Sequence, residues 1–260
     1  MIDIHAPHES VHTWRDILIH LAIVIVGIFV AIGLEQTVEY FHHLHQRHQL
    51  EDNLRDELRV DLRHDANDFR ILADIRAYTV ELKSAVTARR TGKSSPQPPA
   101  ANDPRRHRIP LAPSIAIWDA AKLDATITLL PSRDINIFNG VVLQHDLTFA
   151  ALDDFQHAAF ALESFEERFI DAPGAFDMGY PAPPPNLDAM SPADLTQYET
   201  LLAAYIKAVD RINVRVHFFD SVIRAVLDGA TDRDDLTRRA FPDGKPPSLD
   251  IPPTTESAQP

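Results

Sequence analysis

An unbroken apolar segment at residues 17–34 is the strongest pattern of hydrophobic and polar positions in the chain. It reads ILIHLAIVIVGIFVAIGL, without a charged residue or a proline, and His20 is its only ionisable side chain. As an α-helix it would be roughly 27 Å long, close to the roughly 30 Å hydrocarbon core of a bilayer. We therefore expect one transmembrane helix at residues 17–34, after an N-terminal tail at residues 1–16.

The flanks of this segment carry residues that are typical of membrane interfaces. Trp14 and Arg15 precede the segment, and Tyr40 and Phe41 follow it. Amphipathic aromatic side chains favour both interfaces of a lipid bilayer. Lys and Arg are similarly few on the two sides, and a short tail before a large C-terminal domain favours an orientation with the tail in the cytoplasm and the domain outside.

Two other interpretations of the segment compete with the transmembrane helix. A cleaved signal peptide has a basic start and a small-residue cleavage site, whereas this N-terminus mixes acidic and basic residues and Leu34 runs on into a charged stretch. A buried core helix of a soluble protein would also be apolar, but the density of β-branched residues and the lack of polar positions argue against it. The transmembrane interpretation is therefore preferred.

Small residues within the segment suggest that it packs against another helix. Gly27 and Ala31 form a small-xxx-small pair, with Gly33 nearby. Such pairs allow two helices to approach closely in a membrane, although they also arise by chance in apolar segments. We expect these residues to contact a second copy of the chain, so that the protein is a homo-oligomer.

Residues 35–90 follow helical periodicity and contain neither glycine nor proline. Charged residues, Asp61 among them, are assigned to the faces away from the apolar stripe, many as pairs three or four positions apart. The pattern predicts one long helix that continues directly from the transmembrane helix as a stalk, as part of a bundle, or as both. The stripe consists of Leu50, Leu54, Leu58, Leu62, Phe69, Leu72, Ile75, Tyr78 or Thr79, Leu82 and Val86.

Residues 91–113 form a linker rich in proline and basic residues. We expect it to be a loop that contacts the acidic helices rather than anionic lipid. Residues 241–260, which are also rich in proline, are expected to be disordered.

The remaining residues, 114–240, predict further helices. The first covers 114–130, with Trp118, Leu123 and Leu129 or Leu130 in the core. The others are predicted from an N-cap at Ser132 to about residue 170, from an N-cap at Ser191 to about residue 228, and over 232–241.

No segment shows sustained alternation of apolar and polar positions, so no β-strand is predicted. The predicted fold class is all-α: a single N-terminal transmembrane helix continuing into a long helix, packed as an antiparallel three- to four-helix bundle.

Composition excludes several classes of function. The formal net charge is −13, which argues against nucleic acid as a partner because phosphate binding needs a positive surface. Cysteine is absent, which excludes disulfides, thiol chemistry and Cys-ligated zinc. No nucleophile elbow or phosphate loop is present, so we expect a protein that is not an enzyme and has no cofactor. Acidic residues from Asp153 to Glu167, Glu166 among them, are interpreted as solvated faces.

Histidines after the apolar segment are the one weak candidate for chemistry. Glu39 and His42 have the i, i+3 spacing of carboxylate metal sites in bundles, and His45 lies one turn further on. Imidazole and carboxylate together could hold a divalent metal ion if a second copy supplied more ligands. The competing interpretation is a polar collar at the level of the lipid headgroups.

The first part of the chain resembles a family of uncharacterised bacterial single-pass membrane proteins. The resemblance rests on Trp14-Arg15, on Ala31-Ile32-Gly33-Leu34-Glu35, on Leu54-Arg55-Asp56-Glu57, and on Trp118-Asp119-Ala120-Ala121 running into Leu129-Leu130-Pro131. It implies a bacterial protein of the inner membrane with a helical domain, and no activity or site residues come with it.

These observations lead to two functional hypotheses. The first is a membrane-anchored, self-associating interaction or scaffold protein with an unknown protein partner. The alternative is a sensory or ligand-binding bundle, for which Trp118 and Tyr205 are candidate pocket residues. A smooth apolar bundle interior favours the first hypothesis, and fully buried charged residues favour the second.

Overall fold

The computed structural model describes residues 14–93, 98–100, 103, 105, 113–170, 185–242 and 244, except for the side chain of Ala66. Residues 1–13, most of the linker, residues 171–184 and nearly all of the tail from residue 243 lie outside the described residues. The predictions of an N-terminal tail and of a disordered C-terminus therefore stay predictions.

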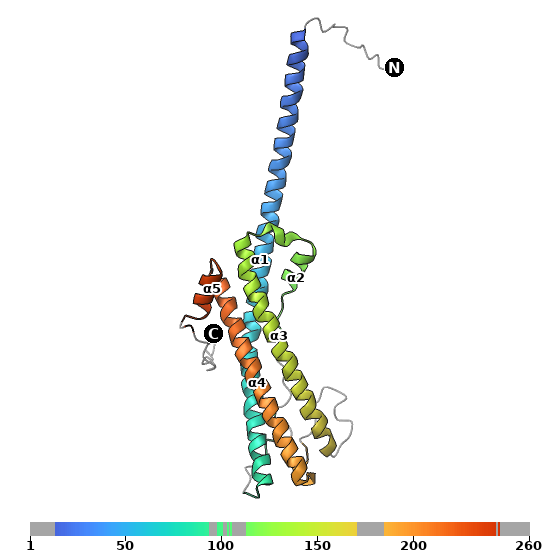
Figure 1. The fold of residues 1–260 in the computed structure, drawn as a ribbon, viewed down its shortest axis with the longest axis vertical. Coiled ribbons are helices and arrows are strands. Elements are labelled where there is room, and N and C mark those ends of the chain that lie inside the picture. Colours follow the sequence, from blue (N-terminus) through green and yellow to red (C-terminus); the bar gives the residue numbers. More distant parts are fainter. Residues whose placement is uncertain are drawn as a thin grey trace, which may run out of the picture.

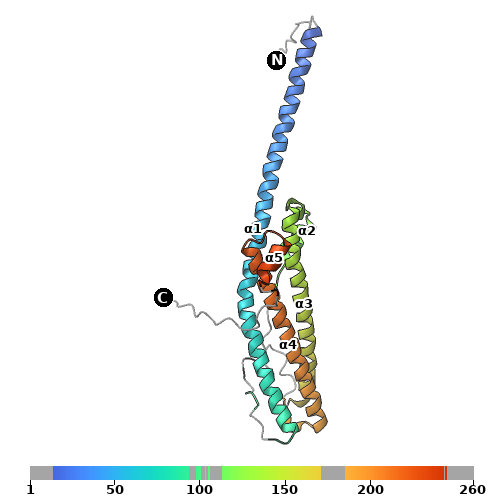
Figure 2. The same ribbon diagram turned by 60° about the vertical axis from the view of Figure 1, so that its left-hand side comes forward.

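Helix α1, Trp14–Arg90, is 77 residues long and joins the apolar segment to the bundle without a break. Its part beyond residue 34 has no glycine or proline to interrupt the backbone hydrogen bonds. The first half of α1 projects alone from the rest of the molecule (Figures 1 and 2). The long helix and its direct continuation from the apolar segment agree with the sequence-based prediction.

The second half of α1 packs in a bundle with α3, Ser132–Glu166, and α4, Pro192–Leu227. Helix α4 runs antiparallel to both other helices and packs against each of them, whereas α1 and α3 run in the same direction (Figure 1). The short helices α2, Ala116–Leu123, and α5, Arg233–Ala240, cover the end nearer the apolar segment, which we call the proximal end. The described residues contain no β-strand, and the all-α prediction is confirmed.

The parallel direction of α1 and α3 requires the linker to return along the bundle. Arg105 forms a salt bridge with Glu81 near the far, distal end, at 2.7 Å. Ser114 reaches Glu57 and Asp61 more than four turns further back along α1. The described part of the basic linker therefore lies against an acidic helix, as the sequence predicted.

Two hydrophobic clusters form the core, one at each end of the bundle. The proximal cluster contains Leu50, Leu54 and Leu58 of α1, together with Trp118 and Phe219. The distal cluster begins at Phe69 of α1 and includes Leu72, Leu82, Phe155, Phe165, Tyr198, Leu202 and Ile212. Helix α4 has a continuous buried apolar stripe, because it contacts two helices; the stripe includes Leu195, Tyr198, Leu202, Val209, Ile212, Val216 and Phe219.

Three predictions about helix ends are settled by the structure. Ser191 caps α4 in a reciprocal capping box with Asp194, with Pro192 at the first helical position, as expected. Ser132 was predicted as the N-cap of α3, but Pro131 holds that position and Ser132 is the first helical residue. The predicted stop of α4 near Gly229 is confirmed, because Gly229 takes a left-handed backbone conformation with φ of 82°.

The predicted continuous helix over 114–130 is wrong. Helix α2 ends at Leu123, and a 3₁₀ turn, η1, follows at Thr126–Leu129. The break arises at Ala125, whose φ is +63°, and Asp124 stabilises it by accepting hydrogen bonds from the backbone and hydroxyl of Thr126. Leu123 was predicted as a core residue, but the break leaves it 89 % exposed, while Trp118 and Leu130 are buried.

Truncating a side chain of the proximal cluster tests whether this packing stabilises the chain. Phe219 is fully buried, so Phe219→Ala is expected to lower the free energy of unfolding by about 3–5 kcal/mol. Phe160 is 71 % exposed, and Phe160→Ala is expected to change it by less than about 0.5 kcal/mol. Urea unfolding of the full chain in detergent, followed by circular dichroism, measures both, and equal effects of the two variants would contradict this packing.

Candidate functional site

A buried polar layer separates the two hydrophobic clusters. Asp61, Asp65 and Asp68 continue the spacing of the α1 stripe at intervals of four and three residues, and all three are at most 5 % exposed. Thr148 of α3 and His217 of α4 are buried at the same level, between the cluster residues of their own helices. We call these five residues the polar layer.

The layer is not apparent from the sequence, because charged residues are ordinarily assigned to the solvent. Asp61 was placed on the polar face of α1, and the structure corrects this, because Leu62 is only partly buried and Asp61 points into the bundle with 3 % exposure. The signal that could have found the layer was geometric. Asp61, Asp65 and Asp68 follow Leu58 at intervals of three, four and three residues, which puts them on the same face of the helix as Leu58.

Two atoms of the layer are buried without a hydrogen-bond partner among the described residues. They are Oδ2 of Asp65 and Nε2 of His217, while Oε1 of Gln144, one turn from Thr148, is a third such atom nearby in sequence. The His217 ring stacks on Phe69, with ring centroids 4.1 Å apart. Buried polar atoms are nearly always hydrogen-bonded in folded proteins, so these two atoms could each form a hydrogen bond, as acceptor or donor, with a water or another small polar species.

Burial sets the protonation of the two aspartates differently. Burial raises the pKa of Asp65 to about 8, with the carboxylates of Asp220, Asp61 and Asp68 adding to the rise and Arg224 opposing it. Burial also raises the pKa of Asp61 to about 6, opposed by the backbone N–H of Ser114. At neutral pH, Asp65 therefore holds a proton and Asp61 is ionised.

Burial lowers the pKa of His217, and the nearby Asp220 partly offsets this effect. His217 is therefore neutral at neutral pH. Asp61 is therefore a buried negative charge at neutral pH, and Asp68 adds to the negative potential around Asp65. Arg224 lies at the edge of the layer and pairs with Asp220 through two hydrogen bonds of 2.8 Å.

Asp61 connects the layer to the linker and to α2. The backbone N–H of Ser114 donates to both carboxylate oxygens of Asp61, at 3.3 and 3.4 Å. One turn earlier, Glu57 accepts the Ser114 hydroxyl at 2.8 Å and the backbone N–H of Ile117 at 3.3 Å. Ile117 lies in the first turn of α2, where N–H groups have no partner within the helix, so two carboxylates of α1 hold the start of α2.

A second buried polar contact lies in the distal cluster. The Tyr198 hydroxyl donates to Glu166 at 2.5 Å, and both residues are buried. This corrects the prediction that Glu166 belongs to a solvated face. Burial raises the pKa of Tyr205, with Glu163 and Glu166 adding to the rise.

The candidate pocket residues are buried without forming a ligand site. Tyr205 lines a cavity of about 30 Å³ with Tyr78, Glu163 and Glu166, which has room for water but not for a larger ligand. Trp118 packs against Phe138 in the proximal cluster, with ring centroids 5.7 Å apart.

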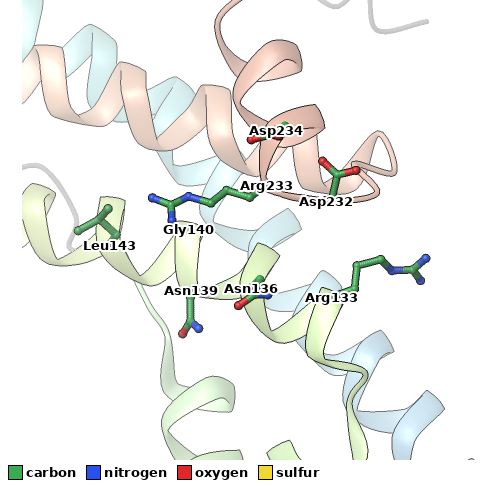
Figure 3. Close-up of a pocket in the computed structure, with 8 residues that line it drawn as sticks. All are labelled: Arg133, Asn136, Asn139, Gly140, Leu143, Asp232, Arg233 and Asp234. Carbon is green, nitrogen blue, oxygen red and sulfur yellow. The ribbon is translucent and has the colours of Figure 1, made fainter.

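A larger cavity of about 590 Å³ opens between α3 and α5. Figure 3 shows Arg233 extending over Gly140 toward Leu143, with Asn136 and Asn139 along α3. Gly140 allows this close approach of the helices, because a Cβ at this position would lie 2.9 Å from Leu236. The charged side chains that line the cavity are exposed and carry both signs, so the cavity is an open polar groove. They are Arg133, Asp232, Arg233 and Asp234.

The residues predicted at the membrane are all exposed on the free part of α1. Glu39, His42 and His45 point into solvent, and no group of three His, Cys, Asp or Glu side chains within the described part of one chain could hold a metal ion. The predicted metal site needs ligands from a second copy, and it stays a prediction.

Replacing Asp65 tests whether its buried carboxyl group has a raised pKa. The folded chain retains this proton up to about pH 8, whereas the unfolded chain loses it near pH 4. Between these values the folded state binds more protons, so Asp65 makes the free energy of unfolding fall as pH rises. Asp65→Asn cannot lose a proton, and we expect it to match the wild type near pH 4 and to be more stable at about pH 8, by up to about 1.4 kcal/mol for each pKa unit.

Urea unfolding of both full-length proteins across this pH range measures the difference between them, which removes the contributions of other groups. Asp153→Asn is the matched control, because Asp153 is exposed on α3. A wild type and an Asp65→Asn variant with the same pH dependence would contradict the burial of the proton.

Comparisons with models of protein families, with curated proteins and with solved structures found no match to this chain.

Proposed function

We propose that the protein is a membrane-anchored sensory module that self-associates through its transmembrane helix. In this proposal residues 17–34 span the inner membrane of a bacterium, the bundle receives the signal, and α1 transmits it to the membrane. The activity is non-enzymatic and consists of a change in helix packing.

The continuity of α1 is the observation that carries the proposal. The same helix contains both the apolar segment and the three buried aspartates. The most apolar 18-residue window of this helix has a mean hydropathy of 3.0, and none of its residues is buried within the chain. An α-helix resists bending over short distances, so a shift of α1 at the polar layer moves the near end of the apolar segment, at Leu34, roughly 40 Å away. The buried charged residues favour the sensory hypothesis over a scaffold with a smooth apolar interior.

The small residues of the apolar segment supply a surface for the second copy. Gly27 and Ala31 are one turn apart on one face of α1, while Gly33 lies about 120° around the helix from Gly27. A Cβ at Gly27 would meet no atom within 4 Å in the single chain. A larger residue at this position therefore affects only contacts with another molecule.

A static scaffold is the second candidate function. Phe149 and Phe160 are 42 % and 71 % exposed on α3, and their spacing of eleven residues puts them on one face. Such exposed aromatic side chains favour a protein partner. A scaffold predicts the same self-association, but without any change in helix packing when conditions change.

Disulfide crosslinking tests the self-association directly, because the chain contains no cysteine of its own. Val24 lies on the face of Gly27 and Ala31, whereas Phe29 lies on the opposite face. We expect Val24→Cys to crosslink in membranes. We expect the yield of crosslinked dimer from Phe29→Cys to be at least about tenfold lower. Adding Gly27→Leu is expected to abolish the Val24→Cys crosslink, and equal crosslinking at both positions would contradict this interface.

A reporter fused to the C-terminus tests the orientation. The proposal puts the bundle in the periplasm, so a reporter that is active only outside the cytoplasm is expected to be active. Both outcomes require the fusion to sit in the membrane fraction. An inactive reporter there, together with activity of a reporter that works only in the cytoplasm, would reverse the orientation.

A further inference from the structure

We propose that Asp61 and Asp65 form a proton-binding pair that controls the docking of the linker and α2 on α1. The ligand is the proton itself. The inference deepens the proposed sensory function by naming the signal, and it rests on that function only for transmission to the membrane.

Asp61 and Asp65 are one helical turn apart on the same buried face of α1, and they are 3 % and 5 % exposed. Two carboxylates one turn apart in a medium of low dielectric constant repel each other strongly when both are ionised. The pair therefore holds one proton readily, and the uptake of a second proton removes the last charge.

Helix α4 contributes an unpartnered polar atom at the same level of the bundle. His217 of α4 is 6 % exposed, and its Nε2 has no hydrogen-bond partner among the described residues, as is also true of Oδ2 of Asp65. Unpartnered polar atoms from two helices at one level of the bundle show that this interior has free capacity for a proton or for a water that carries one.

The charged surroundings of the pair come from all three long helices. On α1 they are Glu57 and Asp68, on α3 His145, and on α4 Asp220 and Arg224. Arg224 is already engaged with Asp220 through two hydrogen bonds. It therefore compensates the carboxylate of Asp220 first, and a proton is the remaining means of neutralising the pair.

The output of the pair is the contact between Asp61 and Ser114. As a carboxylate, Asp61 accepts the Ser114 N–H with both oxygens, and as a carboxylic acid it becomes a weaker, neutral acceptor. Glu57 holds the same residue through its hydroxyl, and also holds the first turn of α2. Protonation of Asp61 thus removes one of the two carboxylates that anchor the linker and α2 to α1.

Hydrogen exchange of the full-length chain in lipid nanodiscs tests the inference. Exchange of the segment 113–123 is compared between about pH 8 and about pH 5, after correction for the intrinsic effect of pH on exchange. We expect protection of this segment in the wild type to fall roughly tenfold at the lower pH, the effect of losing a hydrogen bond to a charged group. Asp61→Asn, which mimics the protonated form, is expected to show the low protection at both pH values.

Asp153→Asn is the matched control and should behave as the wild type, and circular dichroism confirms that each variant is folded. Equal protection of this segment at both pH values in the wild type would overturn the inference, as would wild-type behaviour of Asp61→Asn.

The same samples separate this inference from the proposed function. If exchange responds to pH but the Val24→Cys crosslink does not, the proton-binding pair stands and transmission to the membrane is refuted. If the crosslink is present but exchange is the same at both pH values, self-association stands and the proton-binding pair is refuted.

Discussion

The rest of the structure depends on a single uninterrupted helix whose two parts have different surfaces. The first part of α1 exposes its apolar side chains on every face, whereas the second part buries one stripe against α4. Because α1 is one rigid helix, its buried stripe has a fixed position, and α4 must pack against that stripe. The long return of the linker follows from this constraint, since α3 has to start beside the middle of α1 (Figure 2).

The polar layer gives the bundle a register that hydrophobic packing alone would not supply. Leucines at intervals of four residues tolerate a slip of one turn, but such a slip would move the aspartates into one of the apolar clusters. Burying carboxylates costs stability unless they are neutralised or hydrogen-bonded. Asp61 and Asp65 meet this cost in different ways, the first through the N–H of Ser114 and the second through its own proton.

Much of the fold could be predicted from the sequence, because the helices are long and their periodicity is strong. The extent of α1, the capping box at Ser191 and the buried stripe of α4 all follow from local rules. The break at Ala125 could not, because a left-handed alanine has no sequence signal. The site was missed for the opposite reason: local rules assign an aspartate to solvent, and only the packing of α4 over α1 shows that Asp61 and Asp65 are buried.

The three aspartates of α1 also bear on how the chain is made. The apolar segment and the stripe of α1 leave the ribosome well before α4, and at 5–20 residues per second the delay is roughly 10–30 s. During this time the stripe has no partner, and in the proposed membrane-anchored protein a fully apolar stripe next to residues 17–34 would compete for insertion into the bilayer. An aspartate at the centre of a membrane helix is disfavoured by about 2.5–3.5 kcal/mol, so in the proposed membrane-anchored protein Asp61, Asp65 and Asp68 would keep the second half of α1 in water until α4 has been synthesised.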